Sequence, residues 1–102
     1  MSGDGQEPPS EAAPEGKPPL IEYPTTYTFK VMGKQEHGFR AYVRALFHRI
    51  LGIEISPDSM SEQPSSRGKY VSLTVAVVLL SEDQRKAIYE ALHKDKRVLY
   101  YL

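Results

Sequence analysis

The chain has 102 residues, with 13 basic and 13 acidic side chains and no cysteine. This length is sufficient for one small domain. The lack of cysteine excludes disulfides, thiolate metal sites and thiol nucleophiles. The balanced charge gives no indication of a nucleic-acid partner, because such a partner requires a strongly basic surface.

Residues 1–20 differ in composition from the rest of the chain. They hold five of the eight prolines, four acidic residues against one lysine, and none of the ten aromatic residues. Such a segment buries too little apolar surface to offset its conformational entropy. We therefore expect a disordered tail over residues 1–20 and a folded domain over residues 21–102, with an excess of three positive charges in the domain.

The sequence predicts neither export nor membrane insertion. Its N-terminal segment lacks the basic start and apolar stretch of a secretory signal. The longest apolar run, Val75 to Leu80, is far shorter than the roughly 20 residues of a membrane helix. We expect a cytoplasmic protein without a membrane partner.

The first folded element is predicted to be a strand that begins near Pro24 and ends at Gly33. Tyr27, Phe29 and Val31 alternate with polar residues, as in a strand that is buried on one side. The sequence therefore begins its folded part with a half-buried strand.

The second element is predicted to be a helix over residues 39–51, where apolar residues recur at helical spacing and Gly52 suits a C-cap. Its opposite face carries Arg40, Arg44 and His48 at successive i, i+4 positions. This basic face is either an ordinary solvated surface or a binding site for an anionic or protein partner.

The rest of the chain predicts two more strands, a second helix and a last strand. An edge strand is expected over about residues 59–63, and a central strand over residues 70–79 has one wholly apolar face. Ser81 and Gln84 form a capping box for the second helix. A turn at residues 95–97 precedes a final strand, Val98 to Leu102.

This order of elements predicts an α+β, ferredoxin-like βαββαβ fold with a four-stranded antiparallel sheet and two helices on one face. The other face of the sheet then stays open. Its residues include Thr28, Lys30, Ser72, Thr74 and Ala76, and its apolar part indicates contact with a partner.

Two segments carry a resemblance to a known family. Residues 21–33, IEYPTTYTFKVMG, and residues 64–72, PSSRGKYVS, resemble the signature segments of the YbeD-like family of small bacterial proteins. The resemblance covers residues 21–102 and departs from the family pattern between residues 52 and 63 and in the tail. It implies a ferredoxin-like fold similar to regulatory domains of ACT type, which bind amino acids. Some members are linked to lipoate metabolism by gene neighbourhood.

The second signature segment has two interpretations. Ser65, Ser66 and the amides near Gly68 are able to cradle a carboxylate or phosphate, with charge from Arg67 and Lys69. The alternative is a hairpin connection in which Gly68 takes a positive φ and the serines bond to the turn backbone.

Gly33, Lys30 and Tyr70 are further candidates for binding. Gly33 is explained by a strand-to-helix turn, or, by resemblance to ACT domains, as the point where a small ligand approaches the backbone. Lys30 and Tyr70 are the residues whose replacement by alanine would test RNA binding by the sheet, as in an RNA-recognition motif. Residues 69, 71 and 73 are not aromatic here, however, and such motifs stack bases on aromatic rings.

No catalytic, cofactor or metal motif is present. The serines lack a neighbouring base, and His37, His48 and His93 lack metal-ligand spacing. We therefore expect a non-enzymatic regulatory or adaptor domain, without cofactor, that binds a protein through the open sheet face or the basic helix. The alternatives are a sensor of a small anionic metabolite, either an amino acid or lipoate-related, and a weak RNA-binding module. We expect a monomer or a weak homodimer.

Overall fold

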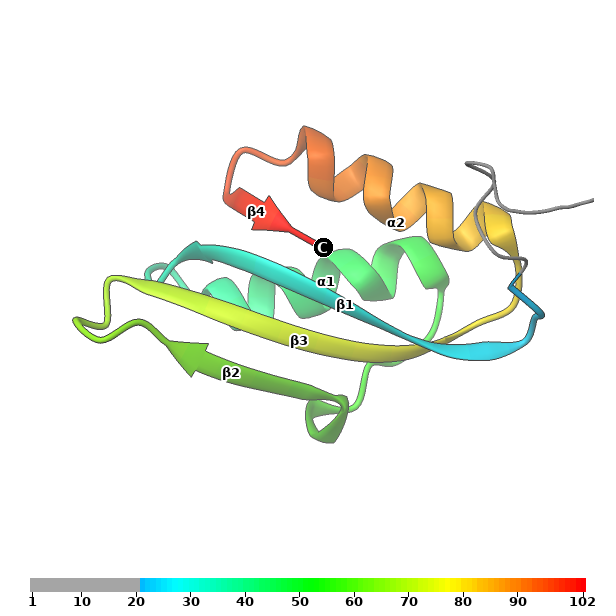
Figure 1. Ribbon diagram of the computed structural model, residues 1–102, viewed down its shortest axis with the longest axis horizontal. Helices are drawn as coiled ribbons and strands as arrows, with labels where there is room; N and C mark the ends of the chain where they lie inside the picture. The colour runs from blue at the N-terminus through cyan, green and yellow to red at the C-terminus, as the bar shows by residue number, and fades with distance from the viewer. Residues whose placement is uncertain (1–20) are drawn as a thin grey trace, which may run out of the picture.

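The computed structural model describes residues 21–102, so the expected tail over residues 1–20 lies outside the described part. The elements are β1 (Thr25–Lys34), α1 (Phe39–Leu51), a 3-10 turn η1 (Pro57–Ser59), β2 (Met60–Pro64), β3 (Tyr70–Leu79), α2 (Glu82–Lys94) and β4 (Val98–Tyr101). The strands form one antiparallel sheet in the order β2-β3-β1-β4 (Figure 1). The predicted α+β fold is thereby confirmed.

The alternating pattern of the long strands divides the sheet into two faces. Phe29 and Val31 of β1 are buried, and so are the odd-numbered residues of β3 from Val71 to Leu79. Side chains at even positions point to the opposite face, since successive residues of a strand alternate. The helices therefore cover one face and leave the other open.

Both helices are fixed by signals that the sequence displays. Gly52 ends α1 in the left-handed conformation, with its amide bonded to the His48 carbonyl at 2.8 Å. At the start of α2 the Ser81 hydroxyl accepts from the Gln84 amide at 3.3 Å, and the Gln84 side chain accepts from the Leu80 amide at 2.7 Å. The predicted helix C-cap and the Ser81 half of the capping box are confirmed, whereas the Gln84 side chain bonds to the amide before Ser81 rather than to that of Ser81 itself.

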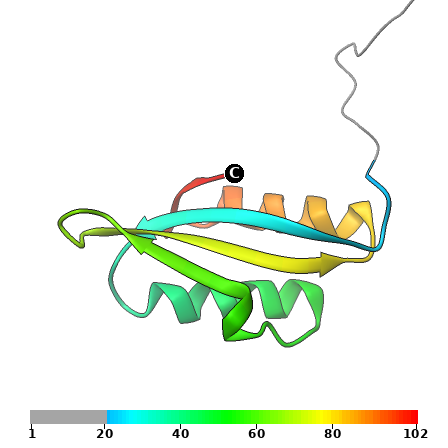
Figure 2. The ribbon, with the colours of Figure 1, turned by 60° about the horizontal axis from the view of Figure 1, so that its bottom comes forward.

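The buried side chains of both helices join the strands in a single core. Helix α1 contributes Phe39, Val43, Leu46, Phe47 and Leu51, and α2 contributes Ile88 and Leu92. In Figure 2, α1 lies in a layer below the sheet. The residues buried in residues 21–102 are all apolar, so burial of these side chains is the main stabilising term.

Two expected boundaries differ from the structure. Strand β1 continues through Gly33 to Lys34, and the left-handed backbone that precedes α1 occurs at His37 and Gly38 instead. Strand β2 begins at Met60, because Pro57 starts the η1 turn and the Ser56 side chain caps it. The expectation that Gly33 ends the strand was therefore wrong, and the second strand is displaced by one residue.

The four strands are unequal in length, and this shapes the sheet. Strands β1 and β3 have 10 residues each, while β2 has 5 and β4 has 4. Strand β2 pairs with residues 71–75 of β3, and β4 pairs with residues 31–33 of β1. At the other end β1 and β3 continue side by side as a two-stranded ribbon (Figure 1).

Candidate functional site

The open face of the sheet gathers apolar side chains from three strands. Register places Met32 of β1 between Ser72 of β3 and Tyr100 of β4. Lys30 exchanges two backbone hydrogen bonds with Leu102, at 3.1 and 2.9 Å, so their side chains share this face. We define the open-face patch as Lys30, Met32, Tyr70, Ser72, Tyr100 and Leu102.

Four apolar members of the open-face patch are substantially exposed. Met32 and Tyr70 expose 37% and 36% of their surface, and Tyr100 and Leu102 expose 56% and 58%. A shallow cavity of about 200 Å³ lies among them, lined by Lys30, Val31, Met32, Ser72, Tyr100 and Leu102. A contiguous patch of this kind is typical of an interaction surface.

The basic side chains of α1 point to the segment that connects α1 to β2. Arg44 Nε donates to the Ile55 carbonyl at 2.5 Å. His48 Nδ1 donates to the Ile53 carbonyl at 2.6 Å, because a carbonyl oxygen only accepts. Two of the three basic positions are thus bonded to alternate carbonyls of one extended segment.

Arg40 continues the same pattern toward β2. One guanidinium nitrogen donates to the Pro57 and Met60 carbonyls at 2.9 and 3.0 Å. The other lies 3.2 Å from a Glu62 carboxylate oxygen. The predicted candidates Arg40 and Arg44 therefore hold this segment in place. Sequence reasoning missed this role, since backbone carbonyls carry no residue-specific signal.

The second signature segment forms the tip of the β2–β3 hairpin. Gly68 has a φ of 69°, and its amide donates to the Ser65 carbonyl at 2.9 Å. The Ser65 hydroxyl accepts from the Tyr70 amide at 3.1 Å. These bonds match the hairpin interpretation and already engage one amide that an anion cradle would use. Ser66, Arg67 and Lys69 are exposed at the tip.

Gly33 is required by packing. A Cβ atom at this position would lie 2.6 Å from the Arg97 carbonyl oxygen and closer still to the Phe39 ring. A cavity of about 210 Å³ lies nearby, lined by Lys34, Glu36, Lys96, Arg97 and Leu99. Arg97 itself is engaged, since it donates to the Glu36 and His37 carbonyls and lies over the Tyr42 ring.

A group of polar side chains joins the start of the domain to α2. The Tyr23 hydroxyl donates to Glu82 at 2.6 Å, and Glu82 pairs with Arg85. The Arg85 guanidinium, together with the Tyr23 hydrogen bond, lowers the pKa of Glu82 to about 2. Sequence reasoning did not identify this group, because Tyr23 and Glu82 are 59 residues apart along the chain.

Tyrosines pack between β1 and α2, beside the part of β1 that does not pair with β4. The Tyr27 and Tyr89 hydroxyls lie 3.1 Å apart. Burial, and then the hydrogen bond to Tyr27, raises the pKa of Tyr89 to about 12. Tyr101 of β4 lies beside Tyr89, with ring centroids 6.0 Å apart, and its hydroxyl is 3.1 Å from His93 Nδ1. These contacts are structural in character.

The described residues also bear on binding to RNA, to metal ions and to membranes. Val71 and Leu73, at positions where an RNA-binding sheet would present rings, are buried in the core. Within residues 21–102 no three histidine or acidic side chains gather as a metal site would require. None of the helices in that range is long and apolar enough to cross a membrane.

Comparison with known proteins identifies relatives in several bacteria. A "UPF0250 protein" of Leptothrix cholodnii is 39% identical over 75 residues, which cover 72% of this chain and 79% of the relative. A UPF0250 protein of Ralstonia nicotianae is 40% identical over 73 residues, which cover 72% and 74%. One from Nitrosomonas europaea is 31% identical over 83 residues, which cover 81% and 94%.

A solved structure and a family model agree with these relatives. The solution structure of protein HP0495 from H. pylori superposes with a TM-score of 0.66, at 17% identity, over 86% of this chain and 91% of that one. This likeness supports the fold. The model of the family "Protein of unknown function (DUF493)" matches residues 18–102. The chain therefore belongs to the DUF493 family of small bacterial proteins, also named UPF0250, which is the YbeD-like family that its two signature segments indicated.

Proposed function

We propose that this protein is a non-catalytic adaptor or regulatory domain that binds a protein partner through the open-face patch. The observation that supports this proposal is the exposure of Met32, Tyr100 and Leu102 on one face of the sheet. Aromatic residues and methionine are enriched in protein interfaces, while isolated exposed apolar residues are ordinary. Here they form one patch with a shared cavity.

The open face is a better candidate than the basic helix. Arg40, Arg44 and His48 already bind carbonyls of the α1–β2 connection, so a partner would have to compete with internal hydrogen bonds. The open-face patch combines exposed apolar side chains with Lys30, which lines the same cavity. We therefore propose a partner that inserts an apolar side chain and places an acidic group near Lys30.

Binding without chemistry is consistent with the residues at this surface. The open-face patch contains no histidine, aspartate or glutamate, the side chains that act most often as general acids and bases. The proposal assigns the protein to the cytoplasm as a monomer or a weak homodimer, whose partner covers the sheet.

Photo-crosslinking tests the adaptor function. A photoreactive residue at position 32 in the full chain should crosslink a defined protein, and Tyr100→Glu should abolish that crosslink because it places a charge in the apolar patch. The matched control is Ser66→Glu, which adds the same charge at the exposed hairpin tip. If both charged variants crosslink like the wild type, the adaptor function through this face is wrong.

A sensor of a small anion is the second candidate, supported by the cavity of about 210 Å³ beside Lys34, Lys96 and Arg97. A bound ligand would stabilise the native state by about 2.7 kcal/mol at a hundredfold excess over Kd. Thermal unfolding in the presence of pooled amino acids and lipoate is the test. A stabilisation that Lys96→Ala removes would support the sensor, whereas unchanged unfolding in every pool would contradict it.

A further inference from the structure

The sheet has a free edge at the second half of β3. Pairing with β2 ends at Met60, opposite Val75, although β3 continues to Leu79. The Ser59 amide, next in line to pair, donates to the Ser56 carbonyl at 2.9 Å instead. The η1 turn therefore stops the ladder before β3 ends.

The hydrogen bonds of the sheet show which backbone groups point to this edge. Lys30 bonds to Leu102 on the β4 side, so odd-numbered residues of β1 bond to β3, and odd-numbered residues of β3 bond back. Even-numbered residues of β3 point toward β2, as the bond between Tyr70 and Ser65 also shows. Beyond Met60, the Ala76 carbonyl lies on the open edge, because the Ser59 amide that would pair with it bonds to Ser56 instead. The amide and the carbonyl of Val78 lie on the same edge.

This short stretch of edge has defined limits. The next amide along it, that of Leu80, is bonded to the Gln84 side chain at 2.7 Å. At its other end, the free stretch begins where the pairing between β2 and β3 stops, at Met60. The free edge therefore presents one acceptor at Ala76 and a donor and an acceptor at Val78. An added strand of three residues satisfies all of these groups.

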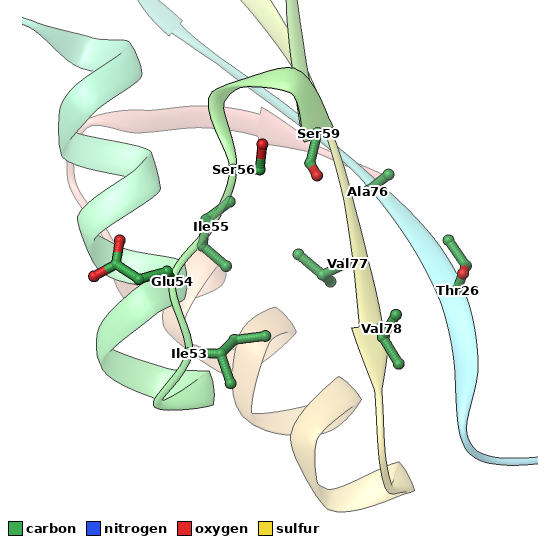
Figure 3. Close-up of a pocket in the computed structure, with 9 residues that line it drawn as sticks. All are labelled: Thr26, Ile53, Glu54, Ile55, Ser56, Ser59, Ala76, Val77 and Val78. Atoms are coloured by element: carbon green, nitrogen blue, oxygen red, sulfur yellow. The ribbon is translucent and has the colours of Figure 1, made fainter.

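A cavity lies beside these groups. It has a volume of about 360 Å³. We define the edge groove by the two walls of this cavity (Figure 3). One wall is residues 76–78 of β3, and the other is residues 53–55 of the segment that connects α1 to β2. Ile53, Ile55 and Val77 are turned into the gap, while Glu54 is turned toward α1 (Figure 3), where it pairs with Arg44. The side chains that face the gap between the two walls are therefore apolar, and Ser56 and Ser59 complete the lining at one end.

The opposite wall is held at a distance from β3 by the basic side chains of α1. Arg44 and His48 bind the Ile55 and Ile53 carbonyls, so the connecting segment is tied to the helix. Val78 and Ile53 remain 50% and 45% exposed at the mouth of the groove. The groove is thus built into the fold by named contacts.

We propose that the edge groove binds an extended, uncharged peptide segment of a partner protein, which adds to β3 as a short strand. Three backbone groups at strand spacing match a peptide backbone, and addition to a sheet edge is a known mode of peptide recognition. The middle residue of the added strand lies opposite Val77 and faces Ile53, which is 45% exposed, so it is apolar. An uncharged peptide fits the apolar side chains of the groove, and Glu54 beside them disfavours the acidic residues 1–20 of the same chain as the occupant.

This inference does not depend on the proposed adaptor function. The edge groove and the open-face patch share no residue, and each proposal has its own variant. Loss of partner crosslinking in Tyr100→Glu reports on the patch alone, while peptide binding at Val78 reports on the groove alone.

Selection of a random heptapeptide library on the immobilised full chain tests the proposal. The selected peptides are expected to share an apolar residue within an extended, proline-free core. They are expected to shift the amide signals of Val78 and Ile53 in spectra of the labelled protein. Methylation of the peptide nitrogen that pairs with the Val78 carbonyl should weaken binding at least about fivefold, because one hydrogen bond is lost.

Val78→Pro is the decisive protein variant. Proline removes the amide that faces the groove, and a proline is tolerated at an edge where the amide faces solvent, so the variant should fold and bind at least about fivefold more weakly. Thr28→Pro is the matched control, because the Thr28 amide points to the β4 side beyond the end of β4. It should leave peptide binding unchanged.

Three results of the peptide experiments would overturn the inference. They are a failure to select any peptide, binding that Val78→Pro does not weaken, and equal weakening by Thr28→Pro. Signals of Val78 that shift with protein concentration, in the absence of peptide, would also overturn it and would assign the edge to a second copy of the chain.

Discussion

At the scale of single residues, Gly33 shows how one position is fixed by its neighbours. It lies within a strand, and the limit on it is the space beneath the Phe39 ring and beside the Arg97 carbonyl. Both neighbours are held in place, since Phe39 is buried in the core and the Arg97 carbonyl belongs to the backbone next to β4. A larger residue must therefore displace the core or the last strand.

We expect Gly33→Ala to lower the free energy of unfolding by about 1–3 kcal/mol, because an added methyl group overpacks the site. Urea unfolding measures this change. The double variant with Phe39→Leu should recover part of the loss, since the ring is one of the two obstacles. If Gly33→Ala unfolds like the wild type, the close packing described here is wrong.

Glu82 links the stability of the domain to pH. Its pKa is lowered from 4.5 to about 2 in the folded protein. A carboxylate with a lowered pKa contributes stability above its unfolded pKa, and this contribution is lost as pH falls through the folded value. The contribution of Glu82 is therefore complete above about pH 5 and disappears near pH 2.

Glu82→Gln checks this dependence. The difference in free energy of unfolding between wild type and Glu82→Gln should be largest near neutral pH and should shrink steadily between about pH 5 and pH 2. Urea unfolding at a series of pH values measures it. Glu90→Gln is the control, because the ion pair of Glu90 with Lys94 is exposed and contributes little. A difference that stays constant with pH would contradict the assignment.

At the scale of elements, α1 has two separate tasks. Its apolar face packs into the core, and its basic face binds carbonyls of the connection to β2. The connection is thereby kept extended beside β3 without pairing to it. The length of β2 and the width of the edge groove both follow from this arrangement.

Arg44→Lys tests the second task. Lysine keeps the charge and lacks the guanidinium geometry, so the Ile55 carbonyl should lose its partner. We expect faster amide exchange at Ser59 and Met60, and a loss of about 1 kcal/mol or less in global stability because the site is partly exposed. Arg49→Lys, at an exposed position on the same helix, should change neither quantity. Unchanged exchange in Arg44→Lys would refute the role.

At the scale of the whole molecule, residues 21–102 contain a complete core. Its buried side chains come from both helices, three of the strands and the connecting segment. A shortened chain that begins at residue 21 should therefore unfold in a single transition. Its free energy of unfolding should lie within about 0.5 kcal/mol of the full chain. Calorimetry of both chains checks this, and a larger loss would show that residues 1–20 contribute to folding.

The order and faces of the elements followed from the sequence by itself. Alternation in residues 25–34 and 70–79, helical spacing in residues 39–51, and the caps at Gly52 and Ser81 are local patterns, and local patterns select secondary structure. The two signature segments identified the family for the same reason, since they are contiguous. The hairpin interpretation of residues 65–69 was available from turn chemistry.

Only the tertiary structure decided the surfaces on which function is proposed. The partners of Arg40 and Arg44 are backbone carbonyls, the limit on Gly33 is set by Phe39 and Arg97, and the free edge of β3 arises because β2 starts late. Each of these depends on atoms that are distant in sequence or shared by every residue, so a linear pattern does not mark them. The sequence determined which residues are buried, whereas three-dimensional packing determined which polar groups remain free to bind.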